Sequence, residues 1–217
     1  MKEIYIIEGL GGIGKSSLVS ALGEQGFFVV KEISDEIPST TRVQEFTFDE
    51  EHARRVNAWF LETEQERIRR TKNQSGIVFM DRGIYSQLAY NFARDHVTGA
   101  HGLLYVLREI KELEIKGIEL AHPMIYLCCS VEYSREAIIQ RNKREQREKI
   151  DKGNMAYVPA FMLKMQEAYS VIEKALGENA LHIGLPEMRG NEIECIQAWI
   201  KKRKRKVKIR ELEEVLI

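Results

Sequence analysis

Gly9-Leu10-Gly11-Gly12-Ile13-Gly14-Lys15-Ser16 matches the complete phosphate-binding loop pattern, and it directly follows an apolar run at residues 4–7 that is typical of a strand. Its glycines permit backbone conformations that side chains would block, so successive N–H groups can turn inward around a di- or triphosphate. Lys15 would reach the β- and γ-phosphates, and the Ser16 hydroxyl would ligate Mg²⁺. A glycine-rich turn without a ligand would need the spacing, the lysine, the serine and the strand to coincide, so we expect a nucleoside triphosphate site. Its predicted residues are Gly9, Leu10, Gly11, Gly12, Ile13, Gly14, Lys15, Ser16 and Ser17.

Short apolar runs recur along the chain and predict a sheet. They occupy residues 4–7, 27–30, 77–80, 124–128 and 180–183. The longer segments between them have the spacing of amphipathic helices, and this alternation is typical of a parallel sheet covered on both faces. We therefore predict an α/β, three-layer P-loop NTPase fold with a five-stranded parallel sheet flanked by helices. A length of 217 residues favours one domain with a short extension.

The charge of the chain is balanced overall but uneven along it. Its 33 basic and 33 acidic residues cancel, which leaves no global field that would favour nucleic acid or a membrane surface. Residues 201–210, however, hold eight Lys or Arg. Such a run could contact nucleic acid or act as a targeting signal, but the end of a solvated helix is the commoner explanation. Beyond it, Leu212, Val215 and Leu216 would dock on the core or on a partner.

The cysteines and the start of the chain indicate a soluble protein. Cys128 and Cys129 are adjacent within an apolar run and Cys195 is the third cysteine, so we expect core thiols and no disulfide framework. The chain enters a predicted strand at once, and it contains no apolar span long enough to cross a membrane. We therefore expect a cytoplasmic location.

Charged side chains follow two predicted strands at the sheet edge where the phosphate loop opens. Asp81 directly follows the run at 77–80, and from there it could bind a Mg²⁺-coordinated water. Arg82 beside it could spread positive charge over a phosphoryl group. A helix-capping Asp followed by a surface Arg is the alternative. Glu32 follows the run at 27–30, where its carboxylate could accept a proton from a substrate hydroxyl, although a solvated acidic turn explains it equally well.

The segment at about residues 134–156 is dense in charge and predicts a helix followed by a turn, which could form an Arg-rich lid. Arg141, Arg144 and Arg147 recur every three residues, so they would lie close together on one helical face. From that face they could close over the transferred phosphate and exclude water. A solvated face is the equal alternative, because glutamates stand among these arginines.

The phosphate loop within Ile6-Ile7-Glu8-Gly9 is followed, in order, by Asp81-Arg82-Gly83-Ile84-Tyr85-Ser86-Gln87-Leu88-Ala89-Tyr90 and by Ile125-Tyr126-Leu127 ahead of the Arg-rich segment. Together these motifs resemble the thymidylate kinase and deoxynucleoside kinase superfamily of P-loop kinases, over roughly residues 1–182. The resemblance implies that Asp81 serves Mg²⁺ or the phosphate network and that Arg82 contacts phosphate.

Departures from both family patterns leave the choice of branch open. Thymidylate kinases usually carry an acidic residue in place of Gly11, and an Arg-Glu-Pro-Gly segment where this chain has Lys31-Glu32-Ile33-Ser34. Deoxynucleoside kinases place a catalytic glutamate before a proline, and Glu32 matches the acid alone. Gln65 is a candidate for their base-recognising glutamine. Ribosylnicotinamide kinase-like proteins offer a third related pattern.

These observations predict a kinase domain at residues 1–190, followed by a helix and basic extension at 191–217. The domain would transfer the γ-phosphoryl group of ATP, with Mg²⁺, to a nucleoside or nucleoside monophosphate. Related kinases are often dimers, so the resemblance makes a homodimer an expectation. The alternatives are a nucleotide-dependent regulatory NTPase or binding module, and a kinase that acts on a nucleic-acid 5′ end or on ribosylnicotinamide.

Overall fold

The computed structural model describes residues 2–33, 50–144, 158–203, 212 and 215–216. In these ranges the strands are β1 (Lys2–Glu8), β2 (Phe28–Val30), β3 (Gly76–Asp81), β4 (Met124–Cys128) and β5 (Ala180–Gly184). The helices are α1 (Lys15–Glu24), α3 (Glu50–Arg70), α4 (Ile84–Thr98), α5 (Gly102–Ile115), α6 (Val131–Arg144), α7 (Pro159–Leu176), the short η3 (Gly177–Asn179) and α8 (Glu192–Lys202). Residues 145–156 of the predicted lid and 204–210 of the basic run lie outside the described residues.

The strands form one parallel sheet in the order β2-β3-β1-β4-β5. This confirms the predicted five-stranded parallel sheet. β1 lies in the middle and residues 4–8 are buried, which is why residues 4–7 form a continuous apolar run rather than an alternating one, and Glu8 is a buried carboxylate at the end of the strand. The register pairs Ile7 with Asp81 and Glu8 with Tyr126, so the carboxyl ends of β1, β3 and β4 meet at the edge where the phosphate loop begins.

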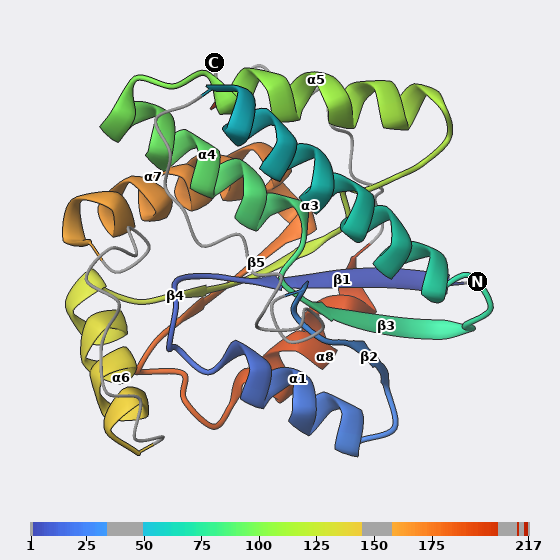
Figure 1. The fold of residues 1–217 in the computed structure, drawn as a ribbon. Coiled ribbons are helices and arrows are strands. Elements are labelled where there is room, and N and C mark those ends of the chain that lie inside the picture. The colour runs from blue at the N-terminus through green and yellow to red at the C-terminus, as the bar shows by residue number, and fades with distance from the viewer. Residues whose placement is uncertain (1, 34–49, 145–157, 204–211, 213–214, 217) are drawn as a thin grey trace.

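Helices cover both faces of the sheet, as the sequence predicted (Figure 1). Helices α1 and α8 lie on one face, while α3, α4, α5 and α7 lie on the other, and α6 stands beside the end of the sheet near β4. On α4 the buried residues Ile84, Leu88 and Phe92 repeat every four positions, which turns one apolar stripe of the helix toward the core. Tyr90 of α4 packs edge-on against Phe161 of α7, with ring centroids 5.1 Å apart.

Two leucines near the C-terminus belong to the same core. Leu212 is fully buried and Leu216 is 5% exposed, and both join the main apolar cluster, whereas Val215 between them is 46% exposed. The predicted docking on the core is thus confirmed for the two leucines. Each buried side chain of this size contributes about 1.5–3 kcal/mol relative to an exposed one.

The three cysteines are free thiols, with Cys129 buried and Cys128 and Cys195 half-buried. This agrees with the prediction of core thiols. Within the described ranges, none of the helices combines the length and the apolar character needed to span a bilayer.

Candidate functional site

The phosphate loop leaves β1 with three glycines in the left-handed half of backbone space, at φ 140° for Gly9, 74° for Gly12 and 98° for Gly14. A Cβ atom at Gly9 would also lie only 2.4 Å from the carbonyl oxygen of Leu127, so the loop passes β4 at a distance that only glycine allows. Gly14 is the N-cap of α1, and the positive end of that helix therefore opens into the loop.

Lys15 lies inside this loop rather than in solvent. The residue is only 4% exposed, and its Nζ donates a hydrogen bond to the carbonyl oxygen of Leu10 at 2.5 Å. The pKa of Lys15 is lowered to about 7, mainly by burial and also by the neighbouring charge of Arg82, while the charge of Glu32 acts in the opposite direction. A buried cation that faces inward in a glycine-rich loop is suited to bind a polyphosphate.

Asp81 and Ser16 form the part of the site that fits a metal ion. Asp81, at the end of β3, is 1% exposed, and the Ser16 hydroxyl donates a hydrogen bond to its carboxylate. Burial raises the pKa of Asp81, which the Ser16 hydrogen bond and the charge of Lys15 oppose. Its buried Oδ1 accepts no hydrogen bond from any of the described residues. An unfilled carboxylate oxygen beside a serine hydroxyl fits Mg²⁺, which binds proteins through one or two such groups and otherwise keeps water and phosphate ligands.

The described residues contain no cluster of three or more His, Cys, Asp or Glu side chains that could hold a metal by themselves.

Arg82 and Glu32 face each other across the sheet edge. The Nε of Arg82 lies 2.9 Å from Oε1 of Glu32, with side chains 19% and 28% exposed. Nη1 of Arg82 also donates to the carbonyl oxygen of Gly9 at 3.1 Å, which links the pair to the phosphate loop. Burial alone would lower the pKa of Arg82, but Glu32 and other nearby acidic groups raise it, so the guanidinium remains charged. The structure therefore brings together Lys15, Ser16, Glu32, Asp81 and Arg82, which the sequence predicted separately.

The backbone of Arg82 is strained. Among the described residues other than glycine, it alone has a positive φ, 57°. A left-handed conformation costs such a residue roughly 1–2 kcal/mol, so surrounding contacts must hold it there.

Arg67 of α3 was not singled out in the sequence, yet it organises this edge. It is fully buried, and its Nη2 donates to the carbonyl oxygens of Lys31 and Asp81, each at 2.7 Å. Its Nη1 donates to Glu64 at 2.5 Å and to the carbonyl oxygen of Arg82 at 3.2 Å. Arg67 thus ties the ends of β2 and β3 together. The available signal was that Glu64 and Arg67 continue the buried face of α3 that includes Leu61.

Helix α6 lies directly against the phosphate loop. The Ser134 hydroxyl donates to the carbonyl oxygen of Gly11 at 2.6 Å, and Ile138 packs so closely that a Cβ atom at Gly12 would lie 2.7 Å from its side chain. Arg141 is half-buried one turn beyond Ile138, and Arg144 is exposed at the last residue of the helix. Arg147 lies outside the described residues, so closure of an Arg-rich lid stays a prediction.

A further arginine contacts the loop from the segment between β5 and α8. Nη2 of Arg189 donates to the carbonyl oxygen of Ile13 at 3.1 Å and to the Tyr133 hydroxyl at 2.9 Å. Arg189 thus joins the loop to α6, although its position in the sequence carried no motif. Gln65, by contrast, donates to the carbonyl oxygen of Leu61 in its own helix at 3.3 Å.

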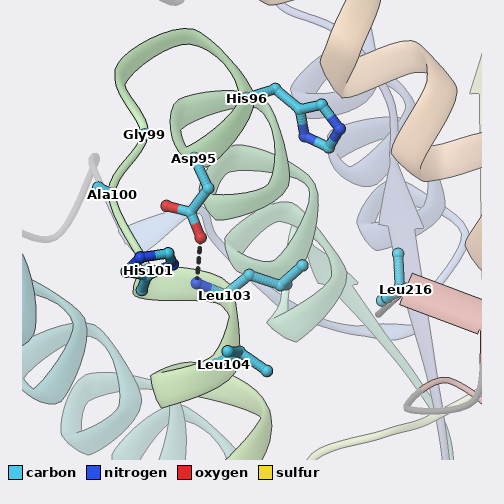
Figure 2. Close-up of a pocket in the computed structure, with 8 residues that line it drawn as sticks. All are labelled: Asp95, His96, Gly99, Ala100, His101, Leu103, Leu104 and Leu216. Carbon is cyan, nitrogen blue, oxygen red and sulfur yellow. Dashed lines mark hydrogen bonds between the residues drawn. The ribbon is translucent and has the colours of Figure 1, made fainter.

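A separate pocket of about 310 Å³ lies at the corner between α4 and α5 (Figure 2). Leu103, Leu104 and Leu216 contribute much of its lining, and none of the phosphate-loop residues reaches it. Its acidic group, Asp95, accepts hydrogen bonds from the backbone N–H groups of Gly102 and Leu103, at 3.0 and 2.7 Å. Asp95 therefore caps α5, and the candidate site remains at the phosphate loop.

Comparison with known proteins agrees with this geometry. A family model of AAA domains matches residues 4–152. This chain belongs to that AAA domain family. No curated protein is significantly similar in sequence to this AAA domain protein.

Solved structures show which fold the AAA domain adopts. Two structures of deoxyadenosine kinase from M. mycoides, one with bound dCTP and one with the products dCMP and a flexible dCDP, align with TM-scores of 0.62 and 0.64. They are 14% and 15% identical to this chain, and each alignment covers 94% of this chain and 100% of the kinase. At this identity the likeness concerns the fold. It confirms the predicted P-loop NTPase fold, which this chain shares with that deoxyadenosine kinase.

Proposed function

We propose that this AAA domain protein is a kinase that transfers the γ-phosphoryl group of ATP to a nucleoside or nucleoside monophosphate. The observation that carries the proposal is the ion pair between Arg82 and Glu32, 2.9 Å apart at the edge of the sheet and hydrogen-bonded through Arg82 to Gly9 of the phosphate loop. Such a pair could serve an attacking water or the oxygen of a second substrate, and the likeness in fold to a deoxyadenosine kinase favours the second substrate. A second substrate with an oxygen nucleophile fits there.

The residues of the site divide into those that stabilise charge and those that direct the acceptor. Lys15 and Arg82 would stabilise the charge that develops on the transferred phosphoryl group. Asp81 and the Ser16 hydroxyl would hold Mg²⁺, which when bound neutralises charge on the β- and γ-phosphates. Arg141 of α6 would approach the phosphates from the opposite side of the loop, together with Arg144 and Arg147.

Glu32 has a role that depends on the acceptor. With a nucleoside, Glu32 would take the proton of the acceptor hydroxyl while the oxygen of that hydroxyl bonds to the γ-phosphorus. The bond between the γ-phosphorus and the oxygen that bridges the β- and γ-phosphates would break, which leaves ADP. With a monophosphate the attacking oxygen is already largely deprotonated near neutral pH, so Glu32 would position the acceptor instead. The likeness in fold to a deoxyadenosine kinase that binds deoxynucleotides supports an acceptor of this class.

A mass-spectrometric acceptor screen tests the proposal. Purified protein, ATP and Mg²⁺ are incubated with nucleosides, nucleoside monophosphates, ribosylnicotinamide and a 5′-hydroxyl oligonucleotide. We expect one class of nucleoside or monophosphate to gain a phosphoryl group. That product should disappear with Lys15→Ala and persist with Lys116→Ala, which changes an exposed lysine at the end of α5.

Two other outcomes would replace the proposal. ATP turnover without any phosphorylated acceptor would indicate a regulatory NTPase. An oligonucleotide that outcompetes every mononucleoside would indicate a kinase of nucleic-acid ends, and would give the basic run at 201–210 a role in binding polyanions.

A further inference from the structure

Glu8, the last residue of β1, is a fully buried carboxylate that the proposed mechanism does not use. Its Oε1 accepts hydrogen bonds from the backbone N–H groups of Gly83 at 2.9 Å and Ser86 at 3.0 Å. These two groups belong to the N-cap and the third residue of α4, which has no side-chain cap of its own. Glu8 therefore caps α4 from a different element of the fold.

Ser86 connects Glu8 to Arg82. The Ser86 hydroxyl lies 2.5 Å from Oε2 of Glu8, and Nη1 of Arg82 lies 3.0 Å from Ser86 Oγ. The guanidinium of Arg82 can only donate hydrogen bonds and an ionised Glu8 carboxylate can only accept them, which determines the direction of both hydrogen bonds. Arg82 donates to Ser86, and Ser86 donates to Glu8. The Tyr169 hydroxyl of α7, 3.2 Å from the same carboxylate oxygen, adds a further donor to this cluster.

Glu8 also restrains the backbone on which Arg82 stands. Arg82 has its left-handed φ of 57°, and its N–H donates to the carbonyl oxygen of Ile7 at 3.0 Å. Glu8 binds the N–H group of the next residue, Gly83, so it holds the chain immediately after the strained position. Glu8 thus restrains both the side chain and the backbone of Arg82, in addition to the ion pair with Glu32.

Packing alone gives no reason for an acidic residue at this place. Burial raises the pKa of Glu8, because removing a carboxylate from water disfavours its charged form. An apolar side chain on β1 would avoid that cost, but it would leave the backbone N–H groups of Gly83 and Ser86 at the start of α4 without the carboxylate that accepts their hydrogen bonds.

We propose that Glu8, acting through Ser86, is a positioning residue that sets the orientation of the Arg82 guanidinium at the phosphate site. The inference rests on the proposed phosphoryl transfer for its kinetic consequence. Its structural consequence, the orientation of Arg82, is measurable without any acceptor. The two readouts separate a failure of this inference from a failure of the proposed function.

The structural readout is the arginine Nε–H region of the ¹⁵N–¹H NMR spectrum. The Arg82 signal is assigned by its loss in Arg82→Lys. We expect this signal to shift and its proton to exchange faster with water in Ser86→Ala and in Glu8→Gln. In Glu8→Gln an NH₂ group would replace the carboxylate oxygen that accepts the Ser86 hydroxyl proton. Ser86→Thr keeps the hydroxyl and should restore the signal. The matched control is Tyr85→Phe, which removes a buried hydroxyl on the same turn of α4 that donates to the carbonyl oxygen of His122 instead.

The kinetic readout uses the acceptor that the screen identifies. We expect Ser86→Ala to lower kcat about 10- to 100-fold, as a misplaced catalytic group does, with ATP affinity unchanged. In an Arg82→Lys background the same change should have little further effect, because the oriented guanidinium is already gone.

Two results would overturn the inference. One is an Arg82 signal in Ser86→Ala that coincides with that of the unmodified protein. The other is an equal loss of kcat from Ser86→Ala in both backgrounds, which would mean that Ser86 acts on stability and not through Arg82. If no acceptor is found at all, the NMR result alone still decides whether Glu8 positions Arg82.

Discussion

Lys15 is a cation whose charge in the free protein depends on pH near neutrality. Its pKa is lowered to about 7, mainly by burial, whereas a bound triphosphate favours the charged form and raises that pKa again. Above pH 7 the free protein holds neutral Lys15, so ATP binding must take up a proton. We expect uptake to approach one proton per site at pH 8.5, and ATP affinity to fall about tenfold per pH unit above 7. Isothermal titration calorimetry with ATP in EDTA, in buffers of different ionisation enthalpy, measures this uptake.

The comparison that isolates Lys15 is Lys15→Gln at the same pH. This variant should bind ATP more weakly and without proton uptake. A proton count near zero in the unmodified protein at pH 8.5 would contradict the low pKa of Lys15.

Helix α3 contributes to the site through one buried arginine. Arg67 donates to the carbonyl oxygens of Lys31 and Asp81, and its ion pair with Glu64 is almost completely buried. Removing one partner of a buried pair leaves an uncompensated charge, so we expect Arg67→Met to destabilise the protein by about 3–5 kcal/mol. Urea denaturation followed by circular dichroism measures the free energy of unfolding.

The same helix supplies the control for this prediction. Arg69 pairs with Glu66 at 2.8 Å, but these side chains are 65% and 47% exposed. Because water screens such pairs, Arg69→Met should change the free energy of unfolding by less than about 1 kcal/mol. Equal effects of the two substitutions would show that Arg67 does not hold β2 and β3 together.

At the scale of the whole molecule, the C-terminal leucines link the end of the chain to the main core. Leu212 and Leu216 are buried in that core, while Val215 between them is 46% exposed. We expect Leu212→Ala and Leu216→Ala each to lower the free energy of unfolding by about 2–5 kcal/mol, since they leave cavities. Val215→Ala should stay within about 0.5 kcal/mol. Thermal denaturation of the full chain compares the three variants, and a loss confined to Val215→Ala would refute this packing.

Short sequence patterns were sufficient to predict the phosphate loop and the strands of the sheet. A phosphate loop requires particular glycines, a lysine and a serine in consecutive order, so local sequence alone was enough to place Gly9–Ser17 after a strand. The apolar runs likewise predicted all five strands, because strands of a parallel sheet covered by helices are rich in apolar residues. Asp81, Arg82 and Glu32 were predicted to lie at one edge of the sheet, where the structure places them, because residues that follow parallel strands emerge at the same edge.

Sequence by itself therefore determined the five parallel strands, the phosphate loop and the charged residues that follow the strands, because each depends on neighbours in the chain, whereas the order of the strands came from the structure. Only the tertiary structure decided the contacts that hold those residues in place. Arg67 comes from a charge-rich helix and Glu8 from the end of an apolar strand, so the neighbours of these residues in the chain do not reveal which groups they bind. Arg67 reaches Asp81, 14 residues away along the chain, and Glu8 reaches Ser86, 78 residues away. A buried charge acquires its role from the groups that fold around it, and those groups are specified by packing and not by sequence neighbours.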